Sequence, residues 1–522
     1  MRNRASGYIT EIGYLQGYSR ELAPAALSLA ALNRRVRTRA SRPLRYLELG
    51  FGQGLSLNIH AAACPGEYWG VDINPAHVAN ARPMADASGS HPHILEGSFT
   101  DILACRDLPE FDIIAASGVW SWISPQNRAA IVDIVRSKLA DGGMLYLSYN
   151  CTPGWSPASP LRHLLSLHAD LAGAGGKGIL DRVDGALDFA QRVADMGIGY
   201  FKANPVAAEC LGAIKTQNRA YVAHEFFNGD WEPMPFSRVA ELLAPANVSF
   251  AVSANLLNHL DGISLSPAAR KLLGEIDHPV LRETVRDYLI DARYRQDIFV
   301  KGGRPMVRQE QEQRYLAQAF ALTHAADEFP AHAGQSQAVI TLQEAVITLE
   351  EDFYQPLIEV LAENSYAPKT LRELATHPRL QGRVLPSLIA ALIILAGAGI
   401  VRPTQAADVI EQARSHCKAL NAHLIGRLPA GGDNAYLASP VIGGGVALSR
   451  SHLLFMQALQ TGRTRPEDWA RFAWDNFFSN AIDSIRGAKP IAPHEESLAA
   501  LTSEANAFSS KRLPILRALE IA

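Results

Sequence analysis

The sequence predicts an α/β protein, with a seven-stranded and mostly parallel sheet in residues 1–303 and a mostly helical region after them. Three observations support this class. Short apolar runs alternate with helical stretches between residues 44 and 148, which is the pattern of a parallel sheet covered on both faces. A turn with three glycines follows the first apolar run, as at the start of a Rossmann-like sheet. Two later strand-like runs would bring the sheet to seven strands.

Each element of the sheet has its own signal. The first five strands are expected at short, mostly apolar segments: Leu44–Leu49, Tyr68–Ile73, His93–Leu95, Phe111–Ala116 and Met144–Ser148. Helices are expected between them at Ser56–Ala63, Pro75–Ala87 and Gln126–Leu139. Ser124 and Pro125 start the third of these helices, and Asp141-Gly142-Gly143 predicts its end. The last two strands are expected at Val248–Ser253 and Gln296–Val300, after a helical insertion and a helix at Pro235–Leu243.

The composition predicts a soluble cytoplasmic protein. The formal net charge of −3 favours neither a nucleic-acid nor an anionic-membrane partner. The five cysteines are scattered, which indicates reduced thiols. Residues 1–8 are charged and lack the apolar stretch of a secretory signal. Leu385–Val401 is an uncharged apolar run, but Pro386, Gly397 and Gly399 interrupt it, so we expect a buried helix and strand rather than a membrane span.

The glycine-rich turn reads Glu48-Leu49-Gly50-Phe51-Gly52-Gln53-Gly54. Its glycines allow a tight turn and the close approach of a ligand, as where a dinucleotide fold meets its cofactor. Leu55 occupies the position at which a G-x-G-x-x-G motif would have its last glycine. Glu48 would repel a pyrophosphate but would attract the ammonium and sulfonium groups of S-adenosylmethionine. We therefore predict S-adenosylmethionine as the cofactor, bound at Glu48, Gly50, Gly52 and Gly54.

Further cofactor contacts are expected where the next three strands end. Asp72 ends the second strand, about twenty residues beyond the glycines, which is where an acid binds a ribose diol in such folds. Ile73 follows it, Ser98 and Phe99 follow the third strand and would cover the adenine, and Ser117 follows the fourth strand. The alternative is an ordinary strand-to-helix turn with an exposed acid, which would leave three costly glycines without a reason.

Several stretches resemble a known family. The glycine-rich segment resembles motif I of class I methyltransferases, and Asp72 resembles their ribose-binding acid. Residues 8–14, Tyr149–Trp155 and His224-Glu225-Phe226 resemble bacterial methyltransferases with a methyltransferase regulatory domain, among them the rickettsial outer-membrane-protein lysine methyltransferases. The resemblance covers residues 8–303 and is loose beyond them. It implies methyl transfer to a lysine, with Tyr14 and Tyr18 folded over the cofactor; the alternative is that these tyrosines only pack the N-terminal segment onto the domain.

The methyl acceptor is predicted from loops outside the glycine-rich turn. Ser117-Gly118-Val119-Trp120 lacks the Asn/Asp-Pro-Pro-aromatic motif of nucleobase-amine methyltransferases, so a protein or a small molecule is expected. We hypothesise that Tyr149, Asn150 and Trp155 line the acceptor channel, with core packing of Trp155 as the alternative.

Two further pairs have open roles. His224 and Glu225 are the acid–base candidates outside the sheet, and a structural pair is the alternative. Trp120 and Trp122 would wall the acceptor site or lie in the core. No metal site is predicted.

The chain is too long for one hydrophobic core. The expected division is a methyltransferase core with a covering N-terminal segment in residues 1–155, a helical insertion in 156–220, the end of the core with the regulatory region in 221–303, a connector in 304–345, a winged-helix-like domain in 346–410 and a C-terminal helical region in 411–522.

Three functions follow from these observations. The preferred one is transfer of a methyl group by in-line displacement to a lysine side chain of a protein. The second is a small-molecule methyltransferase of a biosynthetic pathway. The third is a winged-helix DNA-binding regulator with a non-catalytic cofactor domain, but its recognition helix, Val384–Leu395, has no side chain to read a base edge. We therefore expect the C-terminal region to pack, to form a homodimer or to dock a protein substrate.

Overall fold

The central sheet of the computed structural model has seven strands in the order β4-β3-β2-β5-β6-β8-β7, which confirms the predicted α/β class. The model describes residues 17–39, 43–172, 178–328, 337–341, 346–427, 435–484 and 494–522. All neighbouring strands are parallel except β8, which runs antiparallel to β6 and β7. The strands are β2 (Leu44–Leu49), β3 (Gly66–Asp72), β4 (His93–Glu96), β5 (Phe111–Ala116), β6 (Leu139–Asn150), β7 (Val248–Ser253) and β8 (Tyr294–Lys301).

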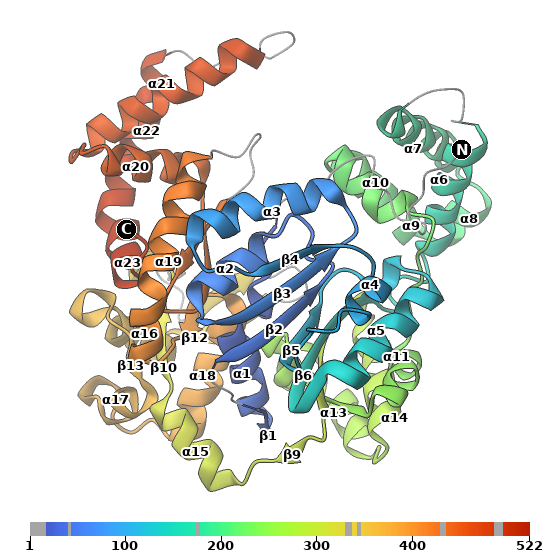
Figure 1. The fold of residues 1–522 in the computed structure, drawn as a ribbon, viewed down its shortest axis with the longest axis horizontal. Helices are drawn as coiled ribbons and strands as arrows, with labels where there is room; N and C mark the ends of the chain where they lie inside the picture. The colour runs from blue at the N-terminus through green and yellow to red at the C-terminus, as the bar shows by residue number, and fades with distance from the viewer. Residues whose placement is uncertain are drawn as a thin grey trace.

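Helices cover both faces of this sheet (Figure 1). On one side lie α2 (Leu55–Ala63) and α3 (Pro75–Ser88), and on the other lie α4 (Phe99–Leu103), α5 (Pro125–Lys138), α11 (Phe236–Leu243) and α14 (Pro279–Ile290). Local signals start several of them. The Asn74 side chain accepts a hydrogen bond from the N–H of Ala76 at the start of α3, and Ser124 does the same for Asn127 in α5. The short helices α12 (Asp261–Ser264) and α13 (Pro267–Gly274) complete the link from β7 to α14.

Several predicted boundaries differ from the structure, and two differences change the role of a segment. Helix α5 ends at Lys138, and β6 begins at the next residue, so Asp141-Gly142-Gly143 lies inside the strand instead of capping the helix. The strand is irregular there, because its register with β5 shifts between Phe111 and Ile113. The start of the segment expected to be a connector also pairs with the N-terminal part of the chain: β9 (Arg304–Pro305) is antiparallel to β1 (Val36–Arg37).

A group of helices projects from the carboxyl edge of the sheet, where the insertion was expected (Figure 1). It has a small apolar core of its own, which includes Leu165, Val183 and Leu211. The helices are α6 (Ser159–Leu171), α7 (Ile179–Asp195), α8 (Gly199–Ala203), α9 (Pro205–Thr216) and α10 (Arg219–Phe227).

The C-terminal region contains small sheets and many helices. Strand β10 (Ala319–Leu322), in the segment expected to be a connector, is the centre of a three-stranded antiparallel sheet with β13 (Lys369–Thr370) and β14 (Val401–Pro403). The other strands are β11 (Gln337–Thr341), β12 (Val346–Glu350), β15 (Ala435–Ser439) and β16 (Gly444–Leu448). The helices are α15 (Arg308–Ala317), α16 (Glu351–Tyr366), α17 (Leu371–Thr376), α18 (Leu385–Ala398), α19 (Ala407–Gly426), α20 (Arg450–Gln460), α21 (Pro466–Ser484), α22 (His494–Ala507) and α23 (Leu513–Ala518). Assignment of this region to the winged-helix class stays a prediction.

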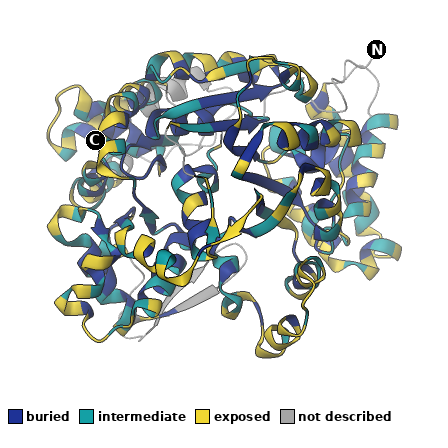
Figure 2. Ribbon diagram, turned by 60° about the horizontal axis from the view of Figure 1, so that its bottom comes forward, coloured by how far each residue is buried: buried dark blue, intermediate teal, exposed yellow. Residues whose placement is uncertain are grey.

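The C-terminal region shares a hydrophobic core with one face of the central sheet. Helix α1 (Pro24–Asn33) lies in this core, together with Tyr46 and Met144 of the sheet and Leu357 and Leu388 of α16 and α18. The inner strands of the central sheet (β2, β3, β5, β6 and β8) are mostly buried and dark blue in Figure 2, whereas the outer faces of the helices are yellow. Helix α18 is part of this shared core and lies against apolar neighbours. Within the described ranges, no helix combines the length and the apolar character that a membrane span needs.

Candidate active site

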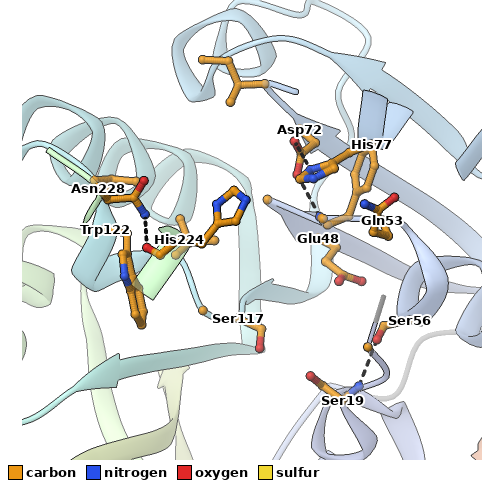
Figure 3. A pocket seen from close by; sticks show the side chains of 18 of the residues that line it. Ser19, Glu48, Gln53, Ser56, Asp72, His77, Ser117, Trp122, His224 and Asn228 are labelled. Carbon is orange, nitrogen blue, oxygen red and sulfur yellow. Dashed lines mark hydrogen bonds and ion pairs between the residues drawn. The ribbon is translucent and has the colours of Figure 1, made fainter. Parts of the chain in front are cut away.

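A cavity of about 830 Å³ lies at the carboxyl ends of the parallel strands. Three of its lining residues lie at or near the ends of strands: Glu48 on β2, Asp72 on β3 and Asn150 on β6. Ser117, which directly follows β5, lines it too. Figure 3 shows two groups of side chains that face each other across this space: Glu48, Asp72 and Gln53 on one side, and Trp122, His224 and Asn228 on the other. The carboxyl edge of an open parallel sheet is the usual ligand position in such folds.

The glycine-rich turn forms the first wall of the cavity. Gly50, Gly52 and Gly54 have φ values of 73°, 58° and 78°, in the left-handed region that favours glycine. A Cβ at Gly50 would lie 2.6 Å from Cγ2 of Val119, and one at Gly54 would lie 2.4 Å from Cβ of Ala81. Gly50 and Gly52 line the cavity. Gly54 instead starts α2 and allows it to pack closely on α3, so its role is to set the helix position.

Asp72 connects the turn to the second strand. Its Oδ2 accepts a hydrogen bond of 2.8 Å from the N–H of Gly52. Its Oδ1 accepts from the N–H of Asn74 at 2.9 Å and lies 3.1 Å from Nδ1 of His77. Because a carboxylate offers about four lone-pair positions, these three contacts hold Asp72 in place and leave acceptor capacity at the cavity. His77 also lines the cavity, and the sequence reasoning missed it.

Glu48 is a buried acid with an unusual environment. Only 4% of the residue is exposed, and no group of the described residues makes a hydrogen bond to its Oε2. Burial, together with the negative charge of Asp72, raises the pKa of Glu48 to about 8. A buried acid that lacks a donor and lines a cavity fits a cationic ligand group, because an ammonium would supply both the missing hydrogen bond and the opposite charge.

The other predicted cofactor residues have varied environments. Ile73, Phe99 and Ser117 line the cavity. Ser98 lines it too, but its hydroxyl donates to Oδ2 of Asp101 at 2.7 Å and caps α4 in a capping box. The Ser98 side chain therefore has a structural role that the sequence reasoning did not assign to it.

The N-terminal tyrosines divide between described and undescribed residues. Tyr14 lies outside the described residues. Tyr18 lines the cavity, and its hydroxyl lies 3.2 Å from Nε2 of His60 on α2. Burial raises the pKa of Tyr18 to about 12, so its phenol is neutral at physiological pH. The next residue, Ser19, donates its N–H to Oγ of Ser56 at 3.1 Å, which ties this segment to the first turn of α2 (Figure 3).

Four predicted acceptor residues lie at the other end of the cavity. Asn150, Trp155, His224 and Glu225 all line it. The backbone of Asn150 is held by the Ser121 hydroxyl at 2.8 Å, and its buried Nδ2 has no hydrogen-bond partner among the described residues. The Trp155 ring packs edge-on against Trp231 and near Phe226, so it contacts the helical insertion and borders the cavity at once. The two interpretations of Trp155 are thus compatible.

His224 is nearly fully buried on α10, and its carbonyl accepts a hydrogen bond of 2.6 Å from Nδ2 of Asn228. In Figure 3 its imidazole points from α10 toward the middle of the cavity. The helix is anchored by Arg162, which donates to the carbonyl of Asn228 at 2.8 Å. The acid–base interpretation of His224 and Glu225 therefore stays a prediction with suitable placement.

Tyr149 requires a correction, because the structure does not bring it to the cavity. Adjacent residues of a strand face opposite sides, and Asn150 takes the cavity side. The Tyr149 side chain is fully buried and donates its hydroxyl to Oδ2 of Asp297 at 2.8 Å. Arg295 binds the same carboxylate and also Asp287, so Tyr149 belongs to a buried ionic network below the sheet edge. Burial, together with the Asp297 carboxylate, raises the pKa of Tyr149 well above its usual value.

The cavity has lining residues that the sequence reasoning missed. Tyr221 is on α10, and Arg293 and Tyr294 are at the start of β8. The antiparallel register of β6 and β8 places Tyr294 opposite Asn150. Trp122 lines the cavity, whereas Trp120 is fully buried in the core. The two placements that were left open, at the cavity and in the core, are therefore each taken by one tryptophan.

The cavity thus has two chemically different ends. The end at the glycine-rich turn offers buried acids and close backbone approach. The opposite end offers aromatic faces, a carboxylate, an imidazole and a carboxamide. Among the described residues, no group of His, Cys, Asp and Glu side chains suits a metal ion.

Comparison with known proteins agrees with this geometry. The family model "Methyltransferase domain" matches residues 47–143, and "Predicted methyltransferase regulatory domain" matches residues 218–301. The uncharacterized protein sll1526 of Synechocystis sp. is 34% identical over 518 residues, which is 99% of each chain. The chain belongs to the methyltransferases that carry this regulatory domain.

Two further proteins are similar to this methyltransferase. The uncharacterized protein RP789 of Rickettsia prowazekii is 24% identical over 48% of this chain and 45% of its own length. The structure of PKMT2 from Rickettsia typhi in complex with AdoHcy has a TM-score of 0.68 and 16% identity, and covers 98% of this chain and 100% of its own. At that identity the likeness concerns the fold.

The family membership identifies S-adenosylmethionine as the cofactor of this methyltransferase. The two matched segments also explain the shape of the cavity. The glycine-rich turn and Asp72 lie in the methyltransferase segment, whereas Tyr221, His224 and Tyr294 lie in the regulatory segment. The regulatory segment therefore completes the cavity.

Proposed function

We propose that this methyltransferase transfers the methyl group of S-adenosylmethionine to a lysine side chain of a protein. One observation carries the proposal: the cavity combines a cofactor end with an acceptor end of four aromatic residues and a carboxylate. The acceptor-end residues are Trp122, Trp155, Tyr221, Tyr294 and Glu225. Aromatic faces attract an alkylammonium, and a carboxylate fixes its charge. The resemblance to the rickettsial lysine methyltransferases supports the same acceptor.

The residues of the first end fit the cofactor. Asp72 would bind the ribose hydroxyls, Gly50 and Gly52 would allow the ligand to approach the backbone, and Glu48 would hold the ammonium of the methionine moiety. Ile73 and Phe99 would cover the adenine faces, and Tyr18 would close the cavity from the N-terminal side. When bound, S-adenosylmethionine supplies a methyl group activated by its sulfonium.

The residues of the second end would prepare the acceptor. A protonated amine has no lone pair, so it must lose a proton before it attacks. Glu225 or His224 would accept that proton once the aromatic walls and the carboxylate have positioned the ammonium. Asn150 would orient the amine through its side-chain oxygen, and Trp155 would hold the aliphatic part of the lysine. Each of these contributions acts by orientation or by proton transfer.

The test is methylation of a cell extract by the purified protein with methyl-labelled cofactor. Label in protease-sensitive bands, followed by recovery of methyl-lysine after hydrolysis, supports the proposal. Label confined to low-mass material would favour a small-molecule acceptor and would reject it. An Asp72→Ala variant is the matched negative control, because it keeps the acceptor end and removes the expected ribose contact. Calorimetry with S-adenosylhomocysteine checks separately that the cofactor end binds.

A further inference from the structure

The C-terminal region reaches the cofactor end of the cavity through one glycine-rich turn. Strands β15 and β16 form an antiparallel hairpin in which Ser439 pairs with Gly444. The first two residues of β16, Gly444 and Gly445, lie against Tyr18. Nothing in the reaction itself requires this contact, although it joins parts of the chain more than 400 residues apart.

Tyr18 is enclosed by groups from three elements. Its ring lies 5.2 Å from the ring of Tyr436 on β15 and 5.4 Å from that of His60 on α2. Its hydroxyl lies 3.2 Å from Nε2 of His60, and the backbone of Gly445 hydrogen-bonds it from the other side. The contacts therefore hold both the ring plane and the hydroxyl of a side chain that lines the cavity.

The two glycines of β16 are required by this contact. A Cβ at Gly444 would lie 2.6 Å from the Tyr18 hydroxyl oxygen, and one at Gly445 would lie 3.1 Å from ring atoms of Tyr18. Neither glycine has a positive φ, so a side chain there meets no backbone strain. Gly443 differs, since its φ is 60° and its turn serves the hairpin itself. The lack of a side chain at Gly444 therefore makes room for the Tyr18 hydroxyl.

A second contact, made by Gln405, connects the hairpin to helix α2. Nε2 of Gln405 donates to the carbonyl of Ala63 at 2.6 Å and to that of Pro440 at 2.7 Å. Ala63 is the last residue of α2, the helix that begins directly after Gly54. The hairpin is therefore tied both to the C-terminal end of α2 and to Tyr18.

We propose that Gly444, Gly445 and Tyr436 of the C-terminal hairpin are positioning residues that seat Tyr18 against α2 and so close the cofactor end of the cavity. The inference rests on the proposed cofactor site. It makes the C-terminal region a part of the cofactor-binding unit, in addition to any docking of substrate.

The experiment is a double-mutant cycle on the dissociation constant of S-adenosylhomocysteine, measured by calorimetry on the full chain. Gly444→Ala displaces Tyr18 and is expected to raise the dissociation constant about tenfold, because the displaced ring no longer covers the cofactor end of the cavity. In a Tyr18→Ala background the same change is expected to add nothing, because the ring that it displaces is gone. Tyr18→Phe removes the clashing oxygen and is expected to restore part of the affinity of Gly444→Ala.

Gly426→Ala is the matched control, because that glycine of α19 has open space around it. Three results would overturn the inference: unchanged affinity in Gly444→Ala, unchanged affinity in Tyr18→Ala, or an effect of Gly444→Ala that persists without the Tyr18 ring. If Gly444→Ala does not fold, Tyr436→Leu takes its place in the same cycle. Failure of the wild-type protein to bind S-adenosylhomocysteine is a different result, since it would reject the proposed cofactor site itself.

Discussion

Glu48 makes the sharpest prediction, because its protonation links stability, cofactor binding and pH. Its folded pKa of about 8 lies above the ordinary value of 4.5. For an acid whose pKa is raised on folding, the folded state is most stable at low pH, where the carboxyl is neutral in both the folded and the unfolded protein. That stability is lost as pH rises from 4.5 to 8, because only the unfolded chain ionises freely over this range.

The magnitude follows from the two pKa values. At pH 7 the pH is 2.5 units above the pKa of the unfolded carboxyl, so that carboxyl is ionised, whereas the folded one is mostly neutral. This difference lowers the free energy of unfolding by about 3 kcal/mol relative to a side chain that is neutral in both states. Glu48→Gln cannot ionise, so we expect it to unfold at a higher temperature than the wild type at pH 7. The advantage should shrink toward zero near pH 4.5.

The same side chain should report the cofactor ammonium. Binding of S-adenosylhomocysteine would favour the ionised Glu48, so the wild type is expected to release about one proton per site at pH 7. Calorimetry in buffers of different ionisation enthalpy measures this number. We expect no release from Glu48→Gln and unchanged release from Glu225→Gln, the matched control. Binding without proton release and without pH dependence between pH 6 and 8 would refute the assignment of Glu48 to the ammonium.

Three other substitutions probe the remaining parts of the site. Trp155→Ala is expected to raise KM for the protein acceptor at least ~10-fold with unchanged affinity for S-adenosylhomocysteine; a wild-type KM would contradict its place in the channel. Glu225→Gln is expected to lower kcat by about 10²-fold at pH 7 and to recover above pH 9, where solvent deprotonates the amine; a defect independent of pH would argue against proton transfer. Gly54→Ala places a Cβ at a φ of 78° and 2.4 Å from Cβ of Ala81, so it is expected to lower the free energy of unfolding by about 2 kcal/mol or more. Gly52→Ala has open space and is expected to lower it by about 1 kcal/mol. Equal melting temperatures of these two variants would show that α2 and α3 separate easily.

Local patterns predicted the sheet well. Strands Leu44–Leu49, Phe111–Ala116 and Val248–Ser253 have the predicted bounds, because apolar runs and caps are properties of neighbouring residues. The end of β6 was less well predicted. Had the strand been extended past Ser148, the alternation of its side chains would have separated Tyr149 from Asn150.

Residues that depend on register or on distant packing carried no local signal. Tyr294 reaches the cavity because β8 pairs with β6 in one register, and that register joins residues separated by the helical insertion and most of the regulatory segment. The sequence at Gly444–Gly445 is that of an ordinary turn. The need for glycine at these two positions is visible only in the structure, where Tyr18 lies against them. A sequence read along the chain identifies a glycine but not the neighbour that excludes a side chain from it.

The shared core argues that the C-terminal region is inseparable from the sheet. Removal of α16 and α18 would expose the apolar sheet face around Tyr46 and Met144 to water, at about 25 cal/mol for each Å² of apolar surface. The match to the Synechocystis protein extends over 99% of both chains, as expected if both parts fold together. Deletion would therefore unfold the cofactor end as well. A role of the C-terminal region in substrate docking is best tested by substitutions on its exposed surface, since these leave the shared core and the Tyr18 contact intact.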